Sequence, residues 1–405
     1  MKRRYLYQDI LDLALTRKKM AFVSGPRQVG KTTLGNSFRS EFHEFEYRNW
    51  DESSFRKIWT KDPNQLGQVF KLENFNSKRL LVLDEIHKSK GWKQKVKGLY
   101  DLLKDDIAFL ITGSARLNIF KKGGDSLMGR YLNFRLHPFS YGELSGERAL
   151  RPEQWKKMLF TTKPKTENQA ILERLMQMSG FPEPYLANSK TILNIWRKSR
   201  NEKIIREDLR DLSRLPELSQ VEMLASLLPE KVGSPLSVQS LREDLEVAHD
   251  TVRRWLNYLE ELYYFFEIKP WNKSIPRSLK KEGKIYLYDW TEVNGEGPQF
   301  ENLVACQLLK ACHFWTDTGE GDFTLHYVRN KEKQELDFLI SKDKKAWLTF
   351  ECKFSDSKMD HKVVDKFQSF TKCPHVQVVY KPDVFRLESS EKLIGSAAFL
   401  FKGLA

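Results

Sequence analysis

The eight residues from Gly25 to Thr32, GPRQVGKT, constrain the fold more than any other part of this 405-residue chain. They match the phosphate-binding pattern G-x-x-x-x-G-K-[ST], whose glycines let backbone N–H groups face phosphate oxygens. The lysine of this pattern reaches the β- and γ-phosphates, and its threonine hydroxyl binds Mg²⁺. The pattern requires a strand before it and a helix after it. Residues 20–23 are short and apolar and residues 33–39 can form a helix, so the sequence predicts an α/β P-loop core that binds ATP and Mg²⁺.

The whole loop is expected to contact the nucleotide, with Lys31 acting in catalysis and Thr32 at the metal. The alternative is a chance glycine-rich turn, and the correct flanking segments argue against it. The expected nucleotide-binding residues of the loop are Gly25, Pro26, Arg27, Gln28, Val29, Gly30, Lys31, Thr32 and Thr33.

Two carboxylates end a second apolar segment. Residues 80–83 form a buried-strand pattern that is followed by Asp84 and Glu85. Because parallel strands carry functional groups at their carboxyl ends, we expect Asp84 to hold Mg²⁺ through water and Glu85 to polarise the attacking water. The pair could also be solvated surface residues, but its position after the P-loop favours catalysis. His87 is expected to have no catalytic role.

A third apolar segment, residues 107–111, stops at small polar side chains. Thr112 and Ser114 are both candidates for a sensor that contacts the γ-phosphate or the attacking water. Arg130 follows, just before the strand-like residues 131–136, and this place suits an arginine finger on the nucleotide of a neighbouring subunit. From the residues alone, an ordinary surface arginine is an equal alternative for Arg130.

The charge of the chain favours a polyanionic partner. The net charge is +14, and residues 1–150 hold 28 Lys and Arg against 17 Asp and Glu. The apolar face of one predicted helix in this half consists of Trp92, Val96, Leu99, Tyr100 and Leu103. Around this helix lie Lys88, Lys90, Lys93, Lys95 and Lys97. These lysines could grip DNA phosphates inside a ring pore, or they could form a plain solvated face.

Residues 237–262 have the pattern of a helix-turn-helix. The second helix would turn Val252, Leu256 and Leu259 toward the hydrophobic core. Arg253 and Arg254 would then point outward as DNA-binding residues. Two strand-like segments follow, joined by a basic wing that holds Lys269, Lys273, Arg277, Lys280 and Lys281. Residues 217–300 nevertheless hold 14 acidic residues against 10 basic ones, so this predicted winged helix could instead dock a protein.

The C-terminal region contains a second candidate site. Residues 334–340 and 346–353 read as a β-hairpin, and alternation along the strands places Glu351 and Lys353 on one face beside Asp337. Two carboxylates can hold Mg²⁺ while a lysine stabilises a pentavalent phosphate. The pattern resembles the PD-(D/E)XK nuclease core, in which these three residues match D, E and K, and Glu301 matches a helix carboxylate that would also bind metal. Ordinary charged hairpin residues, or a nuclease fold kept as a binding platform, remain alternatives.

Several segments together carry a wider resemblance. GPRQVGKTT, LLVLDEIHK, ITGSAR, LMGRYLNFRLHPFSYGEL and GFPEPYL, in this order, resemble AAA-type ATPases of bacteria and archaea that carry a winged helix and a nuclease-like C-terminal region. The resemblance implies ATP hydrolysis between the subunits of a ring, which we expect to be a homo-oligomeric hexamer. It favours Arg130 as the finger, with Arg116 the weaker choice. The layout is also similar to branch-migrating helicases acting on Holliday junctions.

The expected architecture is therefore an α/β chain of four parts. These are a P-loop ATPase core at 1–144, a helical lid at 145–215, a winged helix at 216–284 and a PD-(D/E)XK-like domain at 285–405. The four cysteines show neither metal-binding spacing nor a disulfide framework, and no segment has the length of a membrane span, so a cytoplasmic protein is expected. The expected function is an ATP-driven motor acting on duplex or branched DNA, with Mg²⁺-dependent cleavage as a second activity. A nucleotide-gated docking protein is the alternative.

Overall fold

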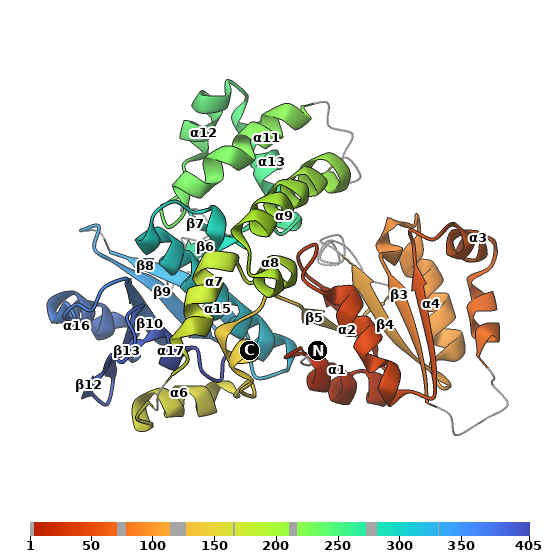
Figure 1. Cartoon of the computed structure of the whole chain (residues 1–405), viewed down its shortest axis with the longest axis horizontal. Helices are drawn as coiled ribbons and strands as arrows, with labels where there is room; N and C mark the ends of the chain where they lie inside the picture. The colour runs from red at the N-terminus through yellow and green to blue at the C-terminus, as the bar shows by residue number, and fades with distance from the viewer. Residues whose placement is uncertain are drawn as a thin grey trace. The chain divides into compact units, whose positions relative to one another are not determined.

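The computed structural model describes residues 4–70, 78–113, 127–164, 167–209, 217–272, 282–330 and 332–405. The chain divides into two compact units, Met1–His137 and Pro138–Ala405. In Figure 1 the first unit is red to orange and the second runs from yellow to blue. None of the helices in the described ranges combines the length and the apolar content that crossing a lipid bilayer requires.

A five-stranded parallel sheet forms the centre of the first unit. Its order is β2-β3-β4-β1-β5, and all residues of β1 and β3 are buried. This agrees with the continuous apolar runs of strands that are covered on both faces. The strands are β1 (Met20–Ser24), β2 (Glu44–Asn49), β3 (Arg79–Asp84), β4 (Ile107–Gly113) and β5 (Tyr131–Arg135). The predicted α/β P-loop core is confirmed.

Helices connect these strands and cover the sheet (Figure 1). The helix α4 buries the five apolar residues predicted for its inner face, from Trp92 to Leu103. They join Phe22, Leu81 and Phe109 of the strands in one core. The helical segments of this unit are α1 (Tyr7–Leu13), η1 (Leu15–Arg17), α2 (Lys31–Ser37), η2 (Phe38–Glu41), α3 (Ser53–Lys61), η3 (Pro63–Val69), η4 (Ile86–Lys88) and α4 (Trp92–Leu103).

The second unit begins with helices from the segment predicted as a lid. They are α5 (Tyr141–Ser145), α6 (Pro152–Thr161), α7 (Gln169–Met178), α8 (Pro182–Ala187), α9 (Lys190–Glu202) and the π-helix η6 (Lys203–Asp208). The structure places them in the compact second unit and not in the first unit. The physical reason is packing, because Trp155 of α6 contacts Trp315 and Trp347, and the Trp290 indole donates to Leu175 O at 2.7 Å. A lid role for 145–215 stays a prediction.

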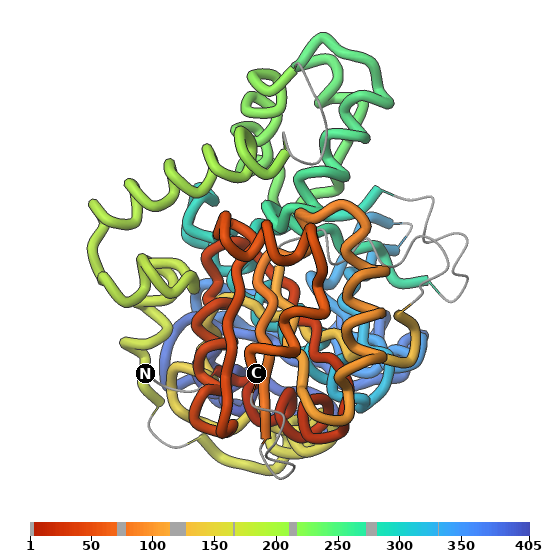
Figure 2. Tube along the Cα trace, turned by 90° about the vertical axis from the view of Figure 1, so that its right-hand side faces the viewer, coloured from red at the N-terminus to blue at the C-terminus, as the bar shows by residue number. Residues whose placement is uncertain are grey.

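A helical group follows, which Figures 1 and 2 both show in green at one end of the second unit. It consists of α11 (Leu218–Leu227), η7 (Leu228–Lys231), α12 (Val238–Leu245) and α13 (His249–Glu261). The Ser237 hydroxyl caps α12 by accepting from Ser240 N, as its N-cap position predicts. The inner face of α13 holds Val252, Leu256 and Leu259 as predicted, and also Trp255. The antiparallel strands β6 (Phe265–Pro270) and β7 (Lys284–Leu287) come next.

An eight-stranded mixed sheet is the centre of the second unit, in the order β12-β13-β11-β10-β9-β8-β6-β7. The remaining helices and strands of the second unit are η8 (Trp290–Glu292), α15 (Glu296–Asp317), β8 (Phe323–Arg329), β9 (Glu335–Lys342), β10 (Lys345–Lys353), α16 (His361–Thr371), β11 (His375–Val379), β12 (Phe385–Ser389), β13 (Lys392–Ser396) and α17 (Ala397–Leu400). The predicted hairpin of β9 and β10 is confirmed, and its turn residues Asp343 and Lys344 have φ of 49° and 68°. Positive φ at both residues is typical of a two-residue type I′ turn.

This sheet crosses the boundary predicted between residues 284 and 285. Strand β6 pairs in parallel with β8 through Lys269 with His326 and Pro270 with Tyr327. The strands of the predicted wing and of the predicted nuclease-like domain therefore share one sheet, and β7 itself spans the boundary. The finer four-part division of the chain stays a prediction.

Trp155 offers a test of how the second unit is held together. Its side chain is 1% exposed, and its indole donates to Leu400 O at 3.0 Å. We expect Trp155→Ala to lower the free energy of unfolding of this unit by about 3–5 kcal/mol, because a large buried ring leaves a cavity. Guanidinium denaturation followed by circular dichroism would measure this. Leu186→Ala, at a side chain that is 58% exposed, should change the free energy of unfolding little. An equally small effect of Trp155→Ala would contradict its role in the core of the second unit.

Candidate functional site

Glycine is required where the predicted phosphate loop leaves β1. Gly25 has φ of +152°, and a Cβ there would lie 2.1 Å from Leu136 O. Gly30 has φ of +97°, and Gln28 between them has φ of +64°. A loop with these dihedral angles turns its backbone N–H groups inward, which is the arrangement that binds phosphate. The backbone thus has the geometry that the motif predicts.

Two cations hold this loop. The Lys31 Nζ donates to Gly25 O at 3.0 Å and to Pro26 O at 2.8 Å, so the side chain folds back over the loop. Arg4 is buried and donates to Val29 O and to His137 O, both at 2.6 Å. Arg4 therefore ties the phosphate loop to the segment after β5. Sequence analysis missed Arg4, because a single arginine 25 residues away from its partner carries no local pattern.

Asp84 is the centre of the site. It ends β3, and the register pairs it with Thr112 of β4. Its side chain is 2% exposed. The Thr32 hydroxyl donates to Asp84 Oδ2 at 2.7 Å, and the Thr112 hydroxyl donates to Oδ1. The structure thus brings together the predicted metal ligands Thr32 and Asp84 and the predicted sensor Thr112, and a hydroxyl next to a carboxylate suits the oxygen preference of Mg²⁺.

A third hydroxyl on Asp84 comes from a residue that sequence analysis missed. The Tyr47 hydroxyl of β2 donates to Asp84 Oδ2 at 2.6 Å. Burial, together with the hydrogen bond and charge of Asp84, raises the pKa of Tyr47 well above its usual value. The phenol therefore keeps its proton and remains a donor. Only the pairing of β2 with β3, which lies outside any local motif, reveals this contact.

Glu85 lies at the turn that follows β3. It has φ of +56°, and its N–H donates to Thr112 O at 3.0 Å. Its Oε2 lies 3.5 Å from His87 Nε2 and 3.9 Å from Lys88 Nζ. Glu85 is therefore placed next to Asp84 at the carboxyl edge of the sheet, as predicted. Ser114 and Arg116, the other predicted residues near this edge, lie outside the described residues.

Arg130 lies at the opposite edge of the sheet. It precedes β5, and its carbonyl accepts from Met20 N, the first residue of β1, at 2.9 Å. Its guanidinium donates to both oxygens of Asp101, at 2.8 and 3.1 Å. This hydrogen bonding raises the pKa of Arg130 and lowers that of Asp101. Arg130 is thus remote from the nucleotide loop of its own subunit, and its action on a neighbouring subunit stays a prediction.

The five predicted DNA-binding lysines differ in their contacts. Lys88 Nζ donates to Asp51 Oδ1 at 2.9 Å, and Lys95 Nζ donates to Trp59 O at 3.0 Å. Lys90 is exposed, and Lys93 and Lys97 are half-buried along α4. Lys88 and Lys95 therefore already bind groups of the first unit.

In the second unit, two of the predicted metal ligands, Asp337 and Glu301, are half-buried and hydrogen-bonded. Asp337 Oδ2 accepts from Cys352 N at 2.7 Å, and Glu301 accepts from the Tyr286 hydroxyl at 2.7 Å. Burial, followed by the charges of Glu301 and Glu351, raises the pKa of Asp337 well above its usual value. Burial also raises the pKa of Glu301, against the opposing effect of Lys284. The three carboxylates are therefore electrostatically coupled, as a shared site requires.

Glu351 and Lys353 line a cavity of about 550 Å³ between β10, β11 and α16. Lys353 Nζ donates to Glu351 Oε1 at 2.8 Å. Burial opposes the charge of Lys353, but this hydrogen bond and the charge of Glu351 raise its pKa. Glu351 Oε2 is buried and has no hydrogen-bond partner among the described residues. The carboxylate oxygen without a partner is what a bound cation would need.

The described residues that line this cavity do not include Asp337 or Glu301. Within the described ranges, no group of three or more His, Cys, Asp and Glu side chains is arranged to hold a metal ion. Mg²⁺ usually keeps several waters and binds through one or two carboxylates, so the donor set around Glu351 still fits this ion. Metal binding by Glu301, Asp337 and Glu351 stays a prediction.

Arg253 and Arg254 are exposed on α13, as predicted. Arg253 lines a cavity of about 520 Å³ beside Glu260, Glu267 and Glu282. Of the predicted basic wing, Lys269 forms an ion pair with Glu267. Lys273, Arg277, Lys280 and Lys281 lie outside the described residues.

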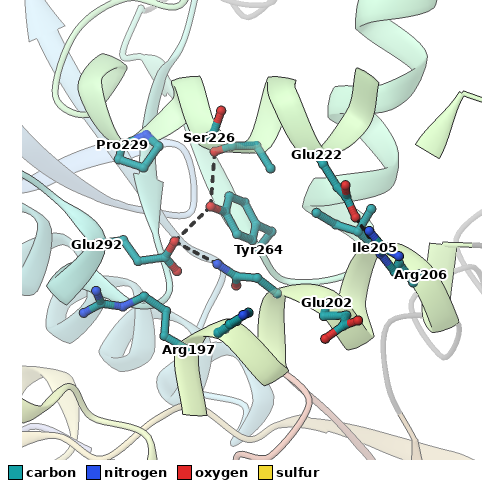
Figure 3. Close-up of a pocket in the computed structure, with 12 residues that line it drawn as sticks. Arg197, Glu202, Ile205, Arg206, Glu222, Ser226, Pro229, Tyr264 and Glu292 are labelled. Carbon is teal, nitrogen blue, oxygen red and sulfur yellow. Dashed lines mark hydrogen bonds and ion pairs between the residues drawn. The ribbon is translucent and has the colours of Figure 1, made fainter. Parts of the chain in front are cut away.

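Another cavity of the second unit, of about 500 Å³, lies beside α9, η6 and α11 (Figure 3). Tyr264 and Glu292 point toward one another there, and the Tyr264 hydroxyl donates to Glu292 Oε2 at 3.0 Å. Asn201 donates to the same oxygen at 3.1 Å, and Arg206 pairs with Glu222 at 2.8 Å. These polar groups mainly bind each other, so we assign this cavity to the packing of the unit.

The parallel sheet, the phosphate loop and the Thr32–Asp84 contact define a P-loop ATPase fold. Residues 17–145 match the family model described as an AAA domain, which supports an AAA-type ATPase and implies nucleotide binding. Residues 169–291 and 296–397 match two models described as domains of unknown function, DUF8612 and DUF4143.

The relatives in the comparison are distant. An uncharacterized protein of Haemophilus influenzae is 22% identical over 350 residues, covering 79% of each chain. One of Methanocaldococcus jannaschii is 24% identical, covering 66% of this chain and 60% of the relative. One of Mycobacterium tuberculosis is 25% identical, covering 68% and 55%.

Solved structures also align with the chain. A Walker-type ATPase of Pyrococcus abyssi aligns at 15% identity and a TM-score of 0.43, covering 75% of this chain and 95% of that one. The ORC1 protein of Aeropyrum pernix, solved in complex with DNA, aligns at 14% identity and a TM-score of 0.29, covering 75% and 93%.

The contact of Tyr47 with Asp84 generates a prediction. Tyr47→Phe removes one donor to a buried carboxylate, and such a hydrogen bond is worth about 1.5–3 kcal/mol. We expect ATP turnover to fall by about tenfold or more at saturating Mg²⁺, because Asp84 loses its orientation. Tyr100→Phe is the matched control, since the Tyr100 hydroxyl donates to Lys18 O near the opposite edge of the sheet. Equal turnover in the two variants would contradict a positioning role for Tyr47.

Proposed function

We propose that the chain is an ATP-hydrolysing motor that acts on duplex or branched DNA, such as a Holliday junction, as a homo-oligomeric ring of six subunits. The observation that carries the proposal is the convergence of Lys31, Thr32, Asp84 and Thr112 at the phosphate loop. These groups fit ATP together with Mg²⁺, and when bound the ion would neutralise the charge that develops on the phosphates.

The chain's own residues would divide the hydrolysis between them. Backbone N–H groups of the loop and Lys31 bind the phosphates, and Thr32 and Asp84 hold the metal. Glu85 orients the attacking water, and Thr112 senses the γ-phosphate beside it. Arg130, at the far edge of the sheet, contributes to the nucleotide of the next subunit in the ring, which is why the motor would require assembly.

The DNA-binding part of the proposal is supported by charge and by local structure. The net charge of +14 favours nucleic acid, and Lys93 and Lys97 on α4, with Lys90 just before it, could contact phosphates. The order of α11, α12 and α13, followed by the antiparallel β6 and β7, agrees with a winged helix whose Arg253 and Arg254 face outward.

The motor proposal predicts that DNA raises the rate of ATP hydrolysis and that Lys31→Ala abolishes it, because the lysine of this motif is the side chain that reaches the β- and γ-phosphates. Phosphate release with and without duplex and four-way junction DNA would measure both effects. Lys57→Ala, at an exposed lysine of α3, should retain turnover. If no DNA structure changes the rate, the motor proposal fails.

We also propose that the second unit cleaves DNA in a Mg²⁺-dependent reaction. The order of α15, the antiparallel strands β8, β9 and β10, then α16 and the parallel strand β11 agrees with a PD-(D/E)XK-like core. Glu351, with Asp337 and Glu301, would hold the metal, and Lys353 would stabilise the phosphorane-like charge. Water adds to phosphorus and gives up a proton, and the bond from phosphorus to the leaving oxygen breaks as that oxygen takes up a proton.

Cleavage is tested by nicking of labelled DNA in Mg²⁺. We expect Glu351→Ala and Lys353→Ala each to reduce nicking by at least about a hundredfold, since each removes charge stabilisation of the transition state. Lys345→Ala is the matched control, because Lys345 is exposed at the other end of the same strand. Nicking that survives in both site variants would exclude this assignment and leave a binding platform.

One observation favours a second candidate function, a nucleotide-gated docking protein. Glu260, Glu267 and Glu282 lie beside Arg253 in one cavity, and such acidic groups repel DNA phosphates. A gel-shift panel at low salt separates the two functions, because failure to bind any nucleic acid would favour docking.

A further inference from the structure

We propose that His375 supplies an imidazole nitrogen to the metal site of Glu351, and that this site therefore binds Mn²⁺ more tightly than Mg²⁺. The inference rests on the proposed metal-dependent cleavage and names a further ligand for it. His375 begins β11, directly beside Thr349 of β10 in the parallel register. It was not among the residues that sequence analysis selected.

The hydrogen bonds around His375 are compatible with the tautomer that a metal ligand requires. The Thr349 hydroxyl has one hydrogen, and its oxygen lies 3.1 Å from Pro374 O and 3.1 Å from His375 Nδ1. Pro374 O also accepts from Thr349 N at 3.0 Å. When the hydroxyl donates to Pro374 O, its oxygen accepts from an Nδ1–H. In that arrangement the proton of the neutral ring is on Nδ1, and Nε2 carries a lone pair.

The Nε2 atom has no hydrogen-bond partner among the described residues, and its ring lines the cavity. His375 is 0% exposed and lines the same cavity as Glu351 and Lys353. Its Nε2 has no hydrogen-bond partner among the described residues, and the same is true of Glu351 Oε2. Burial, with the charges of Lys392 and Lys353, lowers the pKa of His375 to about 3, so the ring stays neutral. A buried lone pair without a partner costs free energy unless a ligand uses it.

The arrangement is the one by which proteins prepare a histidine for a metal ion. A ligating histidine donates its other N–H to a fixed acceptor, which sets its tautomer and its orientation. Thr349 is this acceptor, and its own hydrogen bond to Pro374 O fixes it in turn. Imidazole binds transition metals better than it binds Mg²⁺, so one nitrogen and one carboxylate oxygen, completed by water, favour Mn²⁺.

The chain offers a matched control histidine. His326 of β8 is half-buried in the same sheet, and desolvation lowers its pKa to about 4. Both of its nitrogens have partners, since Nδ1 lies 3.3 Å from Lys269 O and Nε2 lies 3.1 Å from Ser341 Oγ. Its replacement removes an imidazole from the same sheet without removing a nitrogen that lacks a partner.

The test is pulsed electron paramagnetic resonance of Mn²⁺ added to the nucleotide-free full chain. We expect ¹⁴N coupling in the native protein and in His326→Gln, and its loss in His375→Gln with Mn²⁺ binding weakened at least about tenfold. Thr349→Val should keep the coupling and weaken binding about 10- to 100-fold, as the loss of such a supporting contact typically does. Circular dichroism checks that each variant is folded, and a misfolded His375→Gln leaves Thr349→Val and the native signal to decide.

Other outcomes overturn the inference in distinguishable ways. Mn²⁺ that binds through Glu351, as Glu351→Gln reports, but shows no ¹⁴N coupling would exclude His375 as a ligand and leave the cleavage proposal in place. Coupling that is lost in His87→Gln instead of His375→Gln would assign the nitrogen to the nucleotide site, where His87 adjoins Glu85. If no Mn²⁺ binding depends on Glu351, both the inference and the metal-dependent cleavage fail.

Discussion

The carboxylate of Asp84 is the point on which the ATPase unit depends. A buried charge is tolerated only when hydrogen bonds replace its water, and here the hydroxyls of Thr32, Tyr47 and Thr112 provide that replacement. These residues belong to α2, β2 and β4, so the carboxylate joins three elements that lie apart in the sequence. The strand order, with β3 between β2 and β4, is what makes such a meeting possible. The fold and the site are therefore specified together.

The local parts of this arrangement could be predicted from sequence, because their determinants are local. The P-loop follows from glycine conformations and a fixed spacing, the β9–β10 hairpin from two strand patterns around a turn, and α13 from its apolar period. Each signal lies within about 15 residues, the range over which periodicity and turn chemistry act. The same range explains why Thr32, Glu85 and Lys353 could be selected by motif.

The remaining contacts required the tertiary structure. Tyr47 reaches Asp84, and Arg4 reaches Val29 and His137, across separations that no local pattern records. The parallel pairing of β6 with β8 likewise depends on how the sheet closes, so the local patterns that placed a boundary between residues 284 and 285 could not show that one sheet crosses it. The tautomer of His375 belongs to the same class, because it depends on Thr349 across a strand pair.

The two units treat their buried carboxylates differently, and the difference bears on chemistry. Asp84 is surrounded by neutral hydroxyl groups, and each of them donates a hydrogen bond to its carboxylate. Asp337 and Glu301 lie among other carboxylates and apolar groups, and burial raises the pKa of both. Such a cluster is stable only if its members keep protons or gain a cation. The Oε2 of Glu351 and the Nε2 of His375 have no hydrogen-bond partner among the described residues, and both side chains line one cavity together with Lys353. A cation bound in this cavity would give such atoms the partner that the described residues do not provide.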